Sequence, residues 1–164
     1  MEILDQQIEI LVQQAPQDGV TVNLIKVIAP LLKQTASQLR HPEYHVIQGE
    51  GEGWLLTTLS NRVRPEQEKS VIYAFPTEDD AQEYAARNND HRTLVVSVPI
   101  IHILFQLIAL QQVDSVIFVE HAGGAPTGTE VACGGFRRQI QQQIEAYQAQ
   151  LSSTFKPSIP PDIA

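Results

Sequence analysis

Between Ser70 and Glu120 the chain alternates segments typical of strands with segments typical of helices, and this alternation constrains the fold more than any other feature. Short runs of β-branched and aromatic residues indicate strands, whereas polar stretches with regularly spaced apolar residues indicate helices. In chain order the segments are a strand at 70–75, a helix at 77–87, a strand at 94–98, a helix at 100–110 and a strand at 115–119. This β-α-β-α-β order predicts a layered α/β domain in which helices cover a sheet.

Further helices and strands are expected before this unit. Residues 1–40 carry two apolar stripes separated by the turn-forming segment 15–19, which predicts a helical extension. We expect Thr21 to cap the second of these helices and Pro30 to kink or restart it. We expect a hairpin between segments 44–47 and 54–59, connected through the glycines of 49–53. A polar loop should follow at 61–69.

The C-terminal part predicts a connection, a long helix and a tail. Residues 120–129 are rich in glycine and indicate a flexible connection. The helix is expected at 134–153, and its apolar side is formed by Phe136, Ile140, Ile144, Tyr147 and Leu151. Residues 156–164 are rich in proline and indicate a mobile tail. We therefore expect one α/β domain over 1–155, with a mixed sheet of about five strands, a core at 44–120 and helical extensions at both ends.

Five apolar residues are expected to be fully buried, because they lie on segments that are apolar on both sides or on a dense helical stripe. They are Phe75, Val96, Leu104, Ile108 and Ile117.

Charge and composition exclude several classes of partner. The chain has 11 basic and 19 acidic residues, and Arg137-Arg138 is its only adjacent basic pair, so nucleic acid is not an expected partner. The uncharged segment 93–113 is interrupted by Pro99 and carries several glutamines, which argues against a membrane span. The acidic N-terminus does not resemble a secretory signal, so we expect a cytoplasmic protein. One cysteine and scattered histidines predict no disulfide, no metal site and no cofactor.

The glycine-rich segment 123–129 has the glycine spacing of a phosphate-binding P-loop. The lysine that such a loop needs after its second glycine is absent, and Thr129 and Glu130 follow Gly128 instead. A carboxylate at this point reverses the electrostatics that a phosphate requires. The segment is therefore interpreted as a surface loop.

Cys133 lies at the expected start of the long helix, close in sequence to Arg137 and Arg138. A thiol at a helix N-terminus can have a lowered pKa, and arginines can hold an oxyanion. The spacing of cysteine phosphatases would put arginine where Gln139 stands, and a lone cysteine is commonly a buried apolar residue. We assign no catalytic residue and expect an ordinary thiol. The alternative is an anion-binding or thiol-dependent site formed by Gly123, Gly124, Cys133, Gly134, Gly135, Arg137 and Arg138.

Residues 71–84, which read VIYAFPTEDDAQEY, resemble a segment of the SseB-like family, the enhanced serine sensitivity proteins. The strand, helix and strand that follow are similar in order and length to those of the family, and the resemblance covers about half of the chain, residues 44–124. The chain departs from the family at 120–124, where EHAGG replaces the usual Asn-Pro-Gly. The resemblance implies a small α/β domain with a non-enzymatic role, and it supplies no catalytic residues.

The expected function is that of a cytoplasmic binding or adaptor module that forms a homodimer or binds another protein through its terminal helices. Two apolar helical stripes, one at each end of the chain, support this reading. The alternative is the anion-binding or thiol-dependent site at 123–138.

Overall fold

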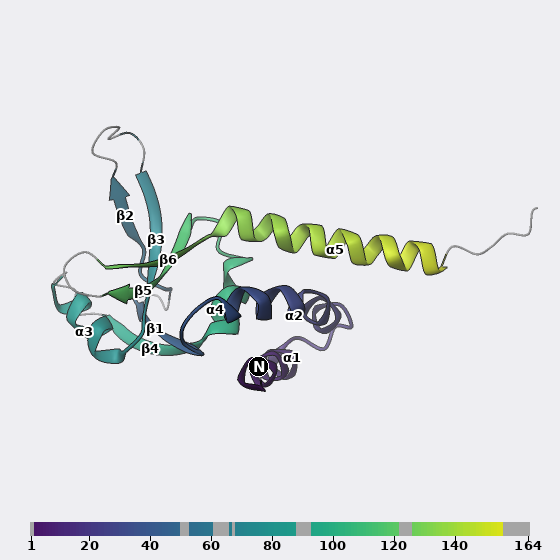
Figure 1. Cartoon of the computed structure of the whole chain (residues 1–164), viewed down its shortest axis with the longest axis horizontal. Coiled ribbons are helices and arrows are strands. Elements are labelled where there is room, and N and C mark those ends of the chain that lie inside the picture. The colour runs from purple at the N-terminus through teal and green to yellow at the C-terminus, as the bar shows by residue number, and fades with distance from the viewer. Residues whose placement is uncertain are drawn as a thin grey trace, which may run out of the picture.

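The structure is a computed structural model that describes residues 2–49, 53–60, 66, 68–87, 93–121 and 126–155, with side chains up to 150. Within this part lie five α-helices and a six-stranded mixed sheet, which confirms the α/β class (Figure 1). The helices are α1 (Glu2–Gln14), α2 (Thr21–Ser37), α3 (Glu78–Arg87), α4 (Ile100–Leu107) and α5 (Cys133–Phe155). The strands are β1 (Glu43–Gln48), β2 (Thr57–Ser60), β3 (Glu68–Phe75), β4 (Leu94–Pro99), β5 (Ser115–His121) and β6 (Thr127–Ala132).

The strands follow the order β4-β1-β3-β5-β6, and β2 pairs with β3 outside this path. β3 and β5 are parallel, and the other pairs are antiparallel. The expected hairpin of 44–47 with 54–59 exists only as a bridge between Gln48 and Trp54, because β2 turns away from β1 and pairs with the start of β3. The loop expected at 61–69 is wrong at its end, since β3 begins at Glu68, and residues 61–65 and 67 lie outside the described part of the chain.

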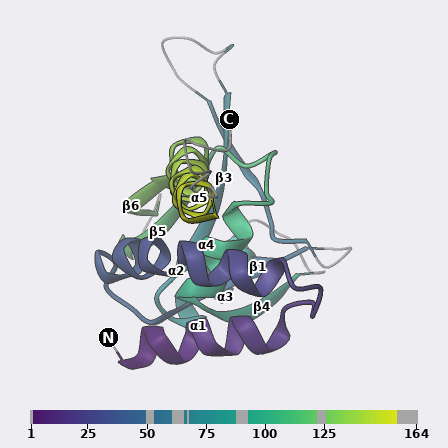
Figure 2. The same ribbon diagram turned by 90° about the vertical axis from the view of Figure 1, so that its right-hand side faces the viewer.

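Helices cover the two faces of the sheet unequally. Figures 1 and 2 show α1, α2, α4 and α5 on one side of the sheet and α3 on the other. Alternation along β3 sends Ile72 and Ala74 into the larger core with the four helices, and sends Tyr73 and Phe75 into a smaller core under α3. α3 begins as expected, because the backbone N–H of Asp80 donates to Thr77 Oγ1 at 3.1 Å.

The N-terminal helices are part of the larger core. α1 packs against α2 and α4, and it forms the outermost layer in Figure 2. The expected cap at Thr21 is wrong: the Asp18 carboxylate accepts the backbone N–H groups of Val20 and Thr21 at 2.9 and 2.8 Å, and Thr21 is the first helical residue. α2 does not restart at Pro30 but runs without interruption to Ser37.

The core prediction is confirmed for Phe75 and Leu104, whose side chains are inaccessible to solvent. It is wrong for Val96, Ile108 and Ile117, which are half-buried. Val96 belongs to β4 at the end of the strand order, Ile108 is the residue at which α4 ends, and Ile117 lies at the margin of the smaller core. An apolar run predicts a strand or a helix, but not how well a neighbouring element covers it.

The connection expected at 120–129 is also partly wrong. β5 continues to His121, and residues 127–132 form β6, which pairs antiparallel with β5. Residues 122–125 and the proline-rich tail at 156–164 lie outside the described part of the chain. α5 follows β6 directly and extends well beyond the rest of the domain (Figure 1). No helix in the described ranges is long and apolar enough to cross a membrane.

Candidate functional site

The glycine-rich segment is not followed by the helix that a phosphate loop requires. Gly123 and Gly124 lie outside the described residues. Gly128 and Thr129 are in β6, opposite Val119 and Phe118, where β5 has an irregularity in its register. A Cβ at Gly128 would clash with the Phe118 carbonyl oxygen, so glycine is required here by the close approach of two strands.

Cys133 is buried at the junction of β6 and α5. Its side chain is inaccessible, and its backbone N–H donates to the Asp114 carbonyl at 2.9 Å. Burial raises the pKa of the thiol above its ordinary value, and the nearby Arg137 guanidinium opposes this effect only in part. The thiol is therefore neutral near pH 7, and its geometry favours core packing over nucleophilic chemistry.

The remaining predicted residues point to different places. Arg137 Nη1 donates to the carbonyls of Leu110 and Leu107 at 2.9 and 3.4 Å, so the guanidinium holds the end of α4. Arg138 is exposed. Gly134 and Gly135 lie in the first turn of α5, and no atom from another part of the chain lies within 4 Å of a Cβ placed on either one. The described members of the predicted set thus do not converge on one cavity.

A charged cluster that the sequence did not predict lies on the C-terminal half of β6, close to Cys133. Glu130 receives a hydrogen bond from the Lys69 ammonium and another from Ser115 Oγ, the second at 2.5 Å. Asp114 is adjacent, and its Oδ2 accepts the backbone N–H of Ser70 at 2.8 Å. The cluster borders a cavity of about 630 Å³. Its members come from β3, β5, β6 and the residue before β5, so only the pairing of the strands reveals it.

The chemistry of this cluster is that of a structural ion pair. The hydrogen bonds from Lys69 and Ser115 lower the pKa of Glu130, which makes its carboxylate a weak base. Ser115 is only 1% exposed, and its hydroxyl proton is directed to Glu130, so a substrate could not reach it without rearrangement. A general base is most effective with a pKa near the working pH, and Glu130 is shifted away from it. Among the described residues, no group of three or more His, Cys, Asp or Glu side chains could hold a metal ion.

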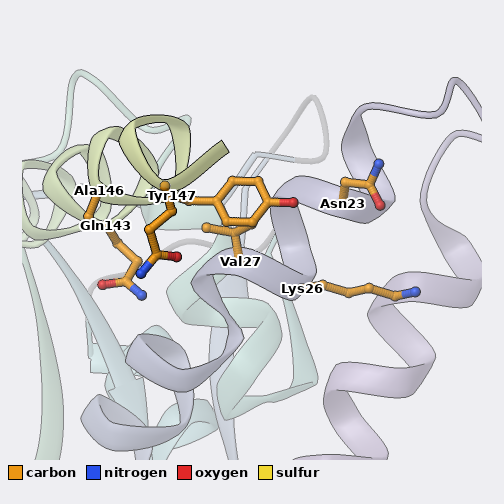
Figure 3. A pocket seen from close by; sticks show the side chains of 7 residues that line it. Asn23, Lys26, Val27, Gln143, Ala146 and Tyr147 are labelled. Atoms are coloured by element: carbon orange, nitrogen blue, oxygen red, sulfur yellow. The ribbon is translucent and has the colours of Figure 1, made fainter. Parts of the chain in front are cut away.

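A second cavity, of about 340 Å³, lies between α2 and α5, and we call it the α2–α5 groove. Figure 3 shows Tyr147 reaching from α5 across Val27 of α2, with Gln143 beside it and Lys26 and Asn23 extending from α2. Tyr147 is 39% exposed, which is high for a large aromatic side chain. The groove combines a partly uncovered apolar floor with neutral amides and one ammonium group.

Comparisons with known proteins add no assignment: no family model matches the chain, and no curated protein matches it.

Proposed function

We propose that this chain is a non-enzymatic, cytoplasmic binding module related to the SseB-like proteins, and that the projecting half of α5 carries its contact surface. The observation that carries the proposal is the position of α5. Phe136 and Ile140 are buried in the domain, whereas every residue from 145 to 150 is exposed. Most helices in proteins are stabilised by tertiary packing of one face, and on residues 145–150 of α5 this packing is partial, with Tyr147 against Val27 of α2.

The spacing along α5 indicates what kind of partner fits. Ile140, Ile144 and Tyr147 are separated by four and three residues, and Leu151 continues the series in the sequence. These steps are typical of a helix that packs against another helix. The apolar stripes of α1 and α2 face mainly the larger core, although Ile3 and Ile10 of α1 are exposed, and we place the contact on α5 because it extends beyond the domain (Figure 1).

The occupant that we propose is the α5 helix of a second copy, seated in the α2–α5 groove. Dimers with twofold symmetry are the most common oligomers, and in such a dimer the same contact is made twice, once from each copy. The charges are complementary: Lys26 is exposed beside the groove, and Glu145 is the only carboxylate among the described side chains of α5. In a twofold pair, Glu145 can approach the partner's Lys26.

A charge exchange tests this arrangement. Light scattering at micromolar concentration should give about twice the chain mass of 18.2 kDa for the unaltered protein. Lys26→Glu places the new carboxylate opposite Glu145 of the other copy at both symmetric contacts. An exposed charge pair contributes roughly 0.2–1 kcal/mol, so dimerisation should weaken about tenfold. The double variant Lys26→Glu/Glu145→Lys should restore the dimer. A monomeric unaltered protein, or a Lys26→Glu variant that dimerises fully, contradicts the proposal.

A further inference from the structure

A third cavity, of about 410 Å³, differs from the others in chemistry. It lies between the segment 53–56 and the turn that connects α4 to β5, and we call it the Trp54 pocket. The side chains that line it are apolar or neutral amides: Trp54, Leu56, Ile72, Ala109, Leu110, Gln111, Gln112 and Val113. No charged residue is among them, in contrast to the cavity beside Lys69 and Glu130. Small-molecule sites are typically apolar cavities of about 300–1,000 Å³ with a few polar groups.

Backbone hydrogen bonds fix the first wall of the pocket. The Gly49 N–H donates to the Gly53 carbonyl at 2.8 Å, and the Leu55 N–H donates to the Ile47 carbonyl at 2.7 Å. Leu55 packs into the smaller core under α3, whereas Trp54 packs against the larger core. Alternation along an extended segment therefore turns Trp54 and Leu56 to the same side. Leu56 is 40% exposed at the pocket, and Ile72 closes its base.

Arg137 fixes the opposite wall. Its guanidinium donates to the carbonyls of Leu107 and Leu110 at the end of α4, and the Leu110 carbonyl also accepts the Val113 N–H at 3.4 Å. The turn then enters β5 through a mutual contact: the Asp114 N–H donates to the Ser70 carbonyl, and Asp114 Oδ2 accepts the Ser70 N–H, both at 2.8 Å. Both walls are thus held in place without a ligand, which lowers the ordering cost of binding.

We infer that the Trp54 pocket binds a small, uncharged, predominantly apolar molecule with an aromatic ring. The Trp54 indole and the leucine, isoleucine and valine side chains provide apolar contact area, and an aromatic ring can stack against the indole. The amides of Gln111 and Gln112 can donate and accept hydrogen bonds at the rim. A charged group would lose its hydration here without gaining a counter-ion, so the pocket selects against it.

The pocket contains its own reporter, because Trp54 is the only tryptophan of the chain. The probes are N-phenyl-1-naphthylamine, which is uncharged, and 8-anilinonaphthalene-1-sulfonate, which has a similar ring system and a sulfonate. We expect the uncharged probe to quench Trp54 fluorescence in a saturable manner, with one probe bound per chain. The anionic probe should bind at least about tenfold more weakly, because no cation of the pocket compensates for its desolvation.

Two leucine variants locate the binding. Leu56→Asp introduces a carboxylate at the pocket and should weaken binding of the uncharged probe about tenfold. Leu59→Asp is the matched control, since Leu59 is 37% exposed and does not line the pocket. Thermal unfolding of both variants checks that each one is folded. Three results would overturn the inference: equal affinity for the two probes, equal weakening of binding by both folded variants, or the absence of saturable quenching. Quenching would be absent if the pocket accepts a protein side chain and not a small molecule.

Discussion

Glu130 connects three strands through one carboxylate. Its oxygen accepts hydrogen bonds from Lys69 on β3 and Ser115 on β5, while its own strand, β6, pairs with β5. The partners differ in exposure: the side chains of Lys69 and Glu130 are 44% and 39% exposed, whereas Ser115 is 1% exposed. Exposed ion pairs contribute little to stability, but a buried hydroxyl without an acceptor is costly. The serine contact should therefore dominate the stability that Glu130 provides.

Substitutions at Glu130 test this order of contributions. Glu130→Ala leaves the Ser115 hydroxyl without its acceptor and should lower the free energy of unfolding by about 1–3 kcal/mol. Glu130→Gln keeps a carbonyl oxygen that can accept the Ser115 hydrogen bond, and Lys69→Met removes only the exposed ion pair. Each should lower the free energy of unfolding by less, about 0–1 kcal/mol. Urea unfolding at pH 7 measures all three. If Lys69→Met costs more than Glu130→Ala, the ion pair is the main contribution and our interpretation is wrong.

The same cluster predicts a pH dependence. The pKa of Glu130 is lower in the folded chain than its ordinary value of 4.5, so the folded state binds this proton less tightly than the unfolded state. The stabilisation from Glu130 is therefore present above pH 4.5 and is lost as the pH falls through the lowered pKa of the folded state. Glu130→Gln should reduce the acid sensitivity of unfolding in this range.

At the scale of elements, Gln7 joins three of them. It is 8% exposed on α1, its Nε2 donates to the Pro42 carbonyl before β1 at 2.7 Å, and its Oε1 accepts the Ile101 N–H at the start of α4 at 3.0 Å. α4 begins after Pro99 and has no side-chain cap at that residue. The Gln7 amide therefore supplies a cap from a distant part of the chain.

Gln7→Met has a similar shape but no hydrogen-bonding groups. It leaves the Ile101 N–H without its acceptor, whereas the Pro42 carbonyl keeps the hydrogen bond from the Ile100 N–H, and it should lower the free energy of unfolding by about 1–3 kcal/mol. Gln6→Met is the matched control, because Gln6 is exposed on the same helix and should change stability by less than about 0.5 kcal/mol. Chemical unfolding followed by circular dichroism compares the two. Equal effects would show that Gln7 is not a cap for α4.

The elements that the sequence predicted well are those with a strong local pattern. β3, α3, β4, α4 and β5 are all present, since apolar runs and helical spacing are local signals. β6 was missed because Thr127–Ala132 is polar and glycine-containing, and it becomes a strand only by pairing with β5. The Glu130 cluster, the Gln7 cap and the role of Arg137 were missed for the same reason, since each joins residues far apart in sequence. The Trp54 pocket likewise depends on how 53–56 lies against the end of α4.

At the scale of the whole molecule, the layers distinguish α5 from the other helices. The N-terminal helices are packed over the sheet with α4 (Figure 2), and Ile3 and Ile10 of α1 are exposed. Leu4, Leu11, Ile28 and Leu32 all contribute to the larger core. The domain therefore closes its own core with four helices, and α5 alone continues past it (Figure 1). In the dimer that we propose, the α5 helix of a second copy packs against this part.

A distance measurement between two copies tests that claim most directly. The experiment compares two variants by pulsed electron resonance, each with one nitroxide label. One variant carries the label at Gln148→Cys on α5 and the other at Gln6→Cys on α1, and both positions are exposed. Cys133 is buried and has a raised pKa, so it should stay unlabelled, which the unsubstituted chain checks. Helices in contact lie about 8–10 Å apart, so the α5 labels should show strong intermolecular coupling. The proposed dimer predicts short distances for Gln148→Cys and longer ones for Gln6→Cys. The absence of coupling at Gln148→Cys, or short distances at Gln6→Cys alone, would contradict it.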